Sequence, residues 1–139
     1  MQAKVKWAQD VKFVGESGTG HQVNMDGPET AGGENTGMRP MELLLLGLGG
    51  CTSFDVIQIL RKARQDVHDC VVSIDSERSD EIPKVFTKIH VHFTITGKAL
   101  SEKRIKRAIE LSADKYCSAS LMLAKTAEIT HDYEIINVN

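Results

Sequence analysis

Polar and apolar residues alternate along the beginning of the chain, which is the pattern of a β-strand with one buried face. The alternation occurs over residues 4–7 and 12–15, and again over residues 21–25 after a glycine-containing turn. Short turns between short strands favour pairing of neighbours. The pattern therefore predicts a three-stranded antiparallel meander.

The next segment, residues 40–65, has the pattern of a buried helix. Pro40 suits a first helical position, and a helix of this length would extend about 39 Å. The segment is apolar on nearly all sides through Leu48 and becomes charged only after Leu60. A helix that is apolar on every side must be buried on every side, which one sheet of a small monomer cannot easily achieve. We therefore expect a homodimer with this helix inside.

Two long strands are predicted next, at residues 69–78 and 84–96. A helix over residues 101–116 follows, then a short helix beginning near Cys117 and a last strand at 127–138. The inward positions of the longer helix are Ile105, Ala108, Ile109 and Ser112. The sequence thus predicts a single α+β domain over residues 1–139, with the order β-β-β-α-β-β-α-α-β.

Charge and the chain's beginning exclude several function classes. The net charge of −2 gives no electrostatic reason to expect nucleic acid or anionic lipid as a partner. The first ten residues lack the pattern of a signal peptide. The longest apolar run, residues 43–48, contains Gly47 and is far shorter than the ~20 residues that span a bilayer. We expect a cytoplasmic protein without a membrane partner.

The chain has three cysteines and no CxxC motif. An odd number in a reducing compartment argues against a structural disulfide framework, so a disulfide here would be catalytic or sensing. Cys51 follows Gly47, Gly49 and Gly50, each of which weakens a helix by up to ~1 kcal/mol relative to alanine. The glycines leave room for a substrate or backbone near the sulfur. They equally suit close helix packing with Cys51 as a small buried residue.

The other cysteines and the histidines leave further alternatives. Cys117 lies where one helix ends and the next begins, a position that either stabilises a thiolate or merely suits a small residue. Cys70 begins a strand without a partner motif, so a structural role is expected. His90 and His92 share a strand face, as in a two-histidine metal site, but a solvated sheet face explains them as well. We therefore predict no metal and no other cofactor.

Two segments carry a resemblance to a known family. The sequence RPMELLLLGLGGC at residues 39–51 resembles the helix that carries the first cysteine of OsmC/Ohr thiol peroxidases. The sequence KYCSAS at residues 115–120 is similar to their second-cysteine segment, and the strand order is also the family's. Similarity is greatest to the YhfA-like branch, through residues 15–17, 76–78 and 115–118.

The resemblance implies a domain-swapped homodimer with two sites at its interface. It implies that Cys51 attacks a hydroperoxide as a thiolate and becomes a sulfenic acid. Cys117 then resolves this acid to a disulfide, which an external dithiol reduces. Organic hydroperoxides are the expected substrates because the implied pocket is apolar, and hydrogen peroxide is a second one. The implied role is defence against oxidative stress.

Two positions depart from the peroxidase pattern. The glutamate that follows the helix's proline in the peroxidases is replaced by Met41. Glu42, nine residues before Cys51, lies on the opposite helical face and is a poor substitute. No arginine precedes Arg39, which makes Arg39 the candidate cation for activating Cys51. These departures favour a non-catalytic redox-sensing or apolar-ligand-binding protein, whereas the cysteine pair favours a peroxidase.

Overall fold

A computed structural model describes residues 1–139 and confirms the predicted α+β order of six strands and three α-helices. It adds a short 3-10 helix, η1 (Glu29–Ala31), and a π-helical turn, η2 (Ser112–Tyr116). The chain divides into two compact units, Met1–Leu46 and Gly47–Asn139. The expectation of one domain over the whole chain stays a prediction.

The first unit contains the predicted meander. Its antiparallel sheet has the order β1 (Ala3–Gln9), β2 (Lys12–Ser17) and β3 (Gln22–Asp26). The three strands begin and end within two residues of the alternating segments, because alternation identifies the paired residues but not the last hydrogen bond of a ladder.

Asp26, at the end of β3, anchors the loop that leads into the long helix. Its buried carboxylate accepts hydrogen bonds through Oδ2 from the Glu34 and Thr36 backbone amides (2.9 and 3.1 Å) and from the Thr36 hydroxyl (2.9 Å). The bond from Glu34 contributes most to lowering the pKa of Asp26 to about 2. Asp26 therefore fixes the path of the chain into the helix.

The long helix α1 (Pro40–Lys62) begins at the predicted proline. The Glu42 carboxylate accepts a hydrogen bond from the Arg39 backbone amide (2.8 Å), as in a capping box. The helix ends three residues before the predicted Gln65, because Arg64 adopts a left-handed conformation with φ 56°. The Gln65 amide then donates to the Leu60 carbonyl, which closes the helix in the manner of a Schellman motif.

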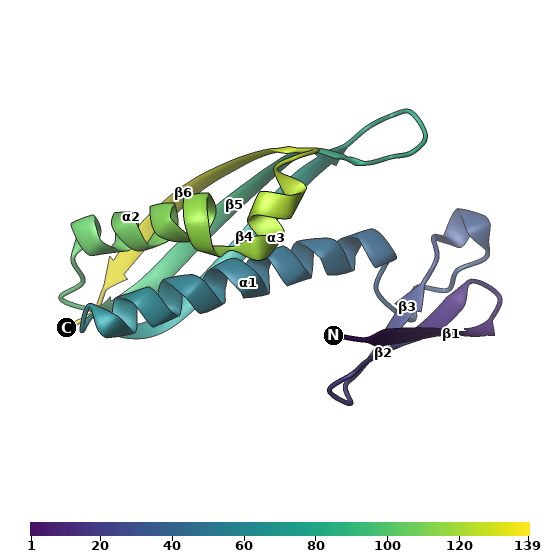
Figure 1. The fold of residues 1–139 in the computed structure, drawn as a ribbon, viewed down its shortest axis with the longest axis horizontal. Helices are drawn as coiled ribbons and strands as arrows, with labels where there is room; N and C mark the ends of the chain where they lie inside the picture. Colours follow the sequence, from purple (N-terminus) through teal and green to yellow (C-terminus); the bar gives the residue numbers. More distant parts are fainter. The chain divides into compact units, whose positions relative to one another are not determined.

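The second unit is a three-stranded sheet covered by helices on one face. Its strands are β4 (Asp66–Arg78), β5 (Phe86–Lys98) and β6 (Glu128–Asn137). Strand β5 pairs antiparallel with β4 and parallel with β6. A parallel pair needs a crossover, which consists of α2 (Glu102–Leu111), η2 and α3 (Ser118–Leu123). In Figure 1 this crossover lies on the same side of the sheet as α1.

The core lies between this sheet and the two longer helices. Strand β5 alternates as predicted, so that Ile89, Val91, Phe93 and Ile95 are all buried. Helix α1 contributes Leu48, Thr52, Val56 and Leu60, which are four residues apart and form one narrow stripe. The other faces of α1 remain exposed within one chain, with Leu46 55% and Phe54 66% accessible. The burial on every side that the sequence predicts is therefore not achieved by a single chain.

Helix α1 is also long and apolar enough, by length and composition alone, to cross a membrane. The sequence had suggested that no segment is long enough to span a membrane, because the uninterrupted apolar run is short. The Gly, Cys, Thr and Ser residues that follow this run are uncharged, however, and they extend the helix. The core helix of a soluble protein has the same properties. The buried stripe on α1 shows that part of this helix packs against a sheet of its own chain.

Candidate active site

Three side chains with acidic groups meet beside the core stripe of α1. Cys51 and Asp55 lie one helical turn apart on α1, and Cys117 approaches from the crossover. The two sulfurs and a carboxylate oxygen of Asp55 all lie within 4.8 Å of one another. Both cysteines are free thiols. The structure thus brings together the two cysteines that the sequence singled out and adds a carboxylate.

The position of Cys117 depends on the π-helical turn η2. The prediction of one α-helix through Tyr116 is wrong, because α2 ends at Leu111 and the chain then widens into η2. The Cys117 amide donates to the Ser112 carbonyl (2.9 Å), five residues back, and Cys117 then begins α3 as its N-cap. The prediction that Cys117 lies where a helix begins is confirmed. Single π turns of this kind frequently occur at functional sites.

A chain of hydroxyl groups connects the site to the core. The hydroxyls of Thr52 and Ser112 lie 2.8 Å apart, and Ser112 donates to Asp55 Oδ2 (3.0 Å). Because an ionised carboxylate only accepts, Ser112 uses its single proton on Asp55 and Thr52 donates to Ser112. Thr52 and Ser112 are fully buried. These bonds fix Asp55 on α1 against the crossover that carries Cys117.

The two thiols differ in exposure. Cys51 is half-buried, whereas Cys117 is completely buried. Burial raises the pKa of Cys117 to about 11, and the neighbouring Cys51 and Asp55 raise it further, against the lowering effect of the Ser120 amide that donates to its sulfur (3.3 Å). The stabilisation expected at a helix start is therefore outweighed by desolvation. Cys117 stays protonated at neutral pH, while Cys51 is the thiol within reach of solvent.

Comparison with known proteins identifies the family. The family model described as OsmC-like protein matches residues 33–132. This chain belongs to the OsmC-like protein family. It is 49% identical to Protein YhfA of Escherichia coli (strain K12) over 139 residues, which covers 98% of both chains. The predicted similarity to the YhfA-like branch is thereby confirmed.

Solved structures show that the fold extends over the whole chain. A hypothetical protein from Aquifex aeolicus VF5 is 27% identical, with a TM-score of 0.87 over 99% of this chain and 97% of that one. An organic hydroperoxide resistance protein OsmC from Legionella pneumophila is 16% identical, with a TM-score of 0.72 over 99% and 96%. Both neighbours therefore share the α+β fold of this chain.

The glycines of the OsmC-like chain around Cys51 serve two purposes. A Cβ atom at Gly49 would lie 3.2 Å from Ile74 Cδ1, so this glycine permits close packing of α1 on β4. Gly47 and Gly50 have no neighbour within 4 Å of such an atom. The sequence left open whether these glycines serve packing or access. Gly49 serves packing, and the other two leave open space on α1.

Arg39 and Glu42 have structural contacts at the start of α1. The Arg39 guanidinium donates to the Gly37 carbonyl (3.4 Å), and the Glu42 carboxylate caps the helix through the Arg39 amide. Both residues belong to the first unit, whereas Cys51, Asp55 and Cys117 belong to the second. The expectation that Arg39 activates Cys51 therefore stays a prediction, as does any catalytic role for Glu42.

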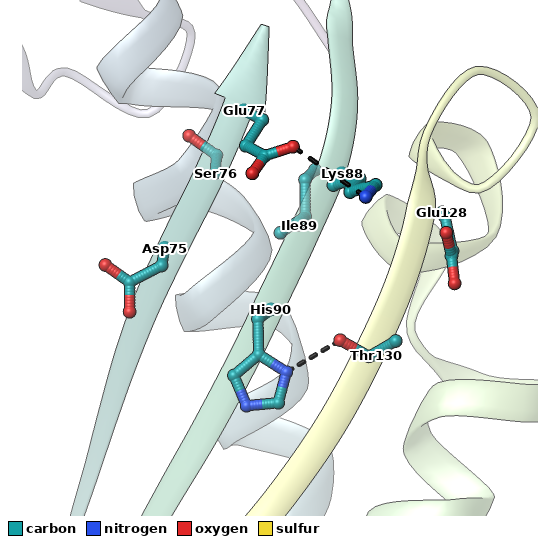
Figure 2. Close-up of a pocket in the computed structure, with 8 residues that line it drawn as sticks. All are labelled: Asp75, Ser76, Glu77, Lys88, Ile89, His90, Glu128 and Thr130. Carbon is teal, nitrogen blue, oxygen red and sulfur yellow. Dashed lines mark hydrogen bonds and ion pairs between the residues drawn. The ribbon is translucent and has the colours of Figure 1, made fainter.

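The remaining candidates lie away from this site. Cys70 is on the core face of β4, opposite Ile95, where burial raises the pKa of its thiol. His90 and His92 lie on the outer face of the sheet, and both donate to Asp132 Oδ1, over 2.8 and 2.6 Å. An open hollow of about 420 Å³ at one end of this sheet includes His90 but no cysteine (Figure 2).

Asp55, Thr52 and Ser112 were not among the site residues inferred from the sequence. Asp55 has a recognisable pattern, since it is the only acidic residue between Glu42 and Arg61 and lies four positions after Cys51. Ser112 was expected to face inward, and it does. No local pattern, however, indicates that Ser112 meets Asp55, because 57 positions separate the two residues.

Proposed function

We propose that this OsmC-like protein is a thiol-dependent peroxidase that reduces organic hydroperoxides, and also hydrogen peroxide, in defence against oxidative stress. The observation that carries the proposal is the sulfur pair, because a solvent-accessible thiol and a buried thiol lie within 4.8 Å of each other. Family membership, and structural neighbours named for organic hydroperoxide resistance, support a redox or stress role.

The exposure of the two thiols supports a different role for each of them. Cys51 attacks the peroxide as a thiolate, forming a sulfur–oxygen bond while the O–O bond breaks, and the departing alkoxide takes a proton to become an alcohol. Cys51 is then a sulfenic acid. Cys117 attacks the Cys51 sulfur, the S–O bond breaks, and the hydroxyl leaves as water with a proton.

Asp55 and Arg39 have complementary roles in this scheme. Asp55 lies within 4.8 Å of the Cys117 sulfur, so a small side-chain rotation would let it accept the proton of Cys117 as that thiol attacks, which would assist a thiol with a pKa of about 11. Arg39 supplies the positive charge that favours the Cys51 thiolate. An external dithiol reduces the resulting disulfide and completes the cycle.

We also propose that the protein works as a domain-swapped homodimer. Leu46 and Phe54 expose apolar side chains on α1, and nothing in the chain contacts the space beside Gly47 and Gly50. A second copy would cover these faces and exclude water from the thiols. In such a dimer, the Arg39 that acts on Cys51 would belong either to the same chain or to the second copy.

The test uses the reduced protein and one equivalent of cumene hydroperoxide, followed by intact-mass and peptide mass spectrometry. The wild type should lose two hydrogens and yield a Cys51–Cys117 peptide. Cys51→Ser should not react, and Cys117→Ser should gain oxygen on Cys51 without forming the disulfide. Cys70→Ser is the matched control and should behave as the wild type does.

The same assay with a dithiol present tests the cation. Arg39→Ala should slow peroxide consumption about tenfold or more, equivalent to ~1.4 kcal/mol of transition-state stabilisation. Arg61→Ala, an exposed arginine at the other end of α1, should leave the rate unchanged. A wild-type protein that neither consumes peroxide nor forms the disulfide would contradict the peroxidase proposal and favour a ligand-binding protein.

A further inference from the structure

We infer that Cys51, Asp55 and Cys117 form a binding site for a thiophilic divalent cation of the Zn²⁺ type, which oxidation of the two thiols empties. Metal binding by the reduced protein follows from the site's geometry and does not depend on catalysis. Only the consequence that the metal regulates peroxide turnover rests on the proposed function.

The donor set is the first argument. Two cysteine sulfurs and a carboxylate oxygen are ligands that Zn²⁺ binds, at about 2.3 Å for sulfur and 2.0–2.2 Å for oxygen. Neighbouring sulfur ligands of a tetrahedral zinc are therefore about 3.8 Å apart. The three atoms here lie within 4.8 Å of one another, so small side-chain rotations bring them to zinc distances. Three protein ligands leave the fourth position open to water or substrate.

The surrounding hydrogen bonds are the second argument. Ser112 donates to Asp55 Oδ2 and is itself held by Thr52, while no hydrogen bond of the chain uses Asp55 Oδ1. The Ser120 amide donates to the Cys117 sulfur. Outer hydrogen bonds of this kind orient metal ligands and raise affinity. The carboxylate is thus positioned by one oxygen and free to coordinate with the other.

Charge is the third argument. None of the chain's ion pairs involves Asp55, so its carboxylate has no cationic side chain as a partner. A partly buried carboxylate beside two thiols favours a bound cation, because the cation stabilises the carboxylate and the thiolates that form when it displaces the thiol protons. The outer-face histidines are poorer ligands, because the nitrogens that face Asp132 already donate to it in an exposed position.

Oxidation would empty the site. When peroxide converts the two coordinating thiolates to a disulfide, the sulfurs supply two electrons, the peroxide oxygens take up two protons and become alcohol and water, and Zn²⁺ leaves. A disulfide sulfur is not a zinc ligand of this kind. Zinc in turn occupies the sulfur that peroxide must reach, so the metal-bound protein should react more slowly than the metal-free one.

The experiment begins with reduced protein that has been stripped with EDTA and desalted. Titration with Zn²⁺ against a chromophoric zinc indicator should give one ion per chain. Cys51→Ser, Cys117→Ser and the isosteric Asp55→Asn should each weaken binding by about tenfold or more. Far-UV circular dichroism verifies that each variant folds, and Asp55→Glu, which keeps a carboxylate, should restore part of the affinity.

Two matched controls locate the site. Cys70→Ser and the double variant His90→Ala/His92→Ala should bind zinc as the wild type does. Co²⁺ in place of Zn²⁺ should give a sulfur-to-cobalt absorption band that Cys51→Ser and Cys117→Ser both reduce. Binding that survives these cysteine changes, or that disappears with the histidine pair, would overturn the inference.

Failure of this inference and failure of the proposed function give different results. Peroxide consumption measured in EDTA tests the peroxidase without zinc, and zinc titration of the reduced protein tests the metal site without peroxide. One equivalent of cumene hydroperoxide should release the bound zinc, which the indicator detects. Binding without peroxide-driven release would support the site and contradict its regulation by the thiols.

Discussion

At the scale of single residues, His92 shows how neighbouring carboxylates control the charge of a side chain on an open sheet. Its Nδ1 donates to Asp132 (2.6 Å) and its Nε2 faces Glu134 (3.4 Å), both on β6. These contacts, with Asp132 first, raise the pKa of His92, and His92 in turn lowers the pKa of Asp132. His90 shares the same carboxylate oxygen.

This arrangement predicts a pH-dependent contribution to stability. Because the pKa of His92 is raised above the ordinary histidine value of 6.5, its contribution is complete below that pH and is lost as pH rises through the folded pKa. Asp132→Asn should lower the His92 pKa, measured by NMR titration of its ring protons, and Glu134→Gln should lower it less. An unchanged His92 titration in Asp132→Asn would contradict this account.

Among the site residues, those with a local sequence pattern could be predicted. Cys51 and Cys117 lie in short segments whose composition marks them, and the structure brings both sulfurs together. Asp55 and Ser112 could not be paired from the sequence, because their contact joins α1 to the crossover across 57 positions. Alternation and helical periodicity describe which face a residue occupies, but not which residue it meets.

At the scale of secondary-structure elements, η2 determines where Cys117 lies. The turn contains one more residue per hydrogen bond than an α-helix, and its closing bond joins the Cys117 amide to Ser112. The five residues of η2 therefore begin with the Ser112 hydroxyl that positions Asp55 and end directly before the buried thiol of Cys117. Nothing in the composition of residues 112–116 distinguishes this turn from ordinary helix.

Insertion of one alanine after Asp114 should abolish the function of this turn while leaving the fold. One additional helical residue rotates the residues that follow it by about 100°, which would turn Cys117 away from Cys51. We expect peroxide-driven disulfide formation to slow about 100-fold, since small displacements of reacting atoms have effects of this size. Asp114→Ala is the control and should react normally. Equal rates in the two variants would show that η2 does not position Cys117.

Element ends were harder to predict than element types. All six strands were predicted at the right places in the chain, because successive side chains of a strand point to opposite faces of its sheet. The end of α1 depends on the left-handed backbone conformation of Arg64. Ala99, which follows the last residue of β5, has the same conformation. Neither arginine nor alanine favours a left-handed conformation, so the ends of α1 and β5 could not be located from residue type.

At the scale of the whole molecule, the exposed apolar side chains of α1 are the basis of the proposed dimer. One chain buries a single stripe of this helix and leaves Leu46 and Phe54 largely exposed. Stable interfaces between proteins bury roughly 1,200–2,000 Å² and are apolar at their centre. An apolar helix of 23 residues suits the centre of such an interface.

Light scattering at micromolar concentration should therefore give twice the chain mass. Phe54→Glu should shift the protein towards monomer, because a charge at the centre of an apolar interface is costly. Val71→Glu is the matched control, since Val71 is similarly exposed but lies on the outer face of β4. A wild type that is monomeric, or a Phe54→Glu protein as dimeric as the wild type, would refute the dimer.

The place of α1 along the chain has a consequence for biosynthesis. The helix ends at Lys62, whereas the sheet that covers its buried stripe is complete only at Asn137. At 5–20 residues per second, the ribosome needs about 4–15 s to make the intervening segment. Throughout that interval the most apolar stretch of the nascent chain has at most an incomplete sheet to pack against, so we expect chaperones that hold apolar segments to bind α1.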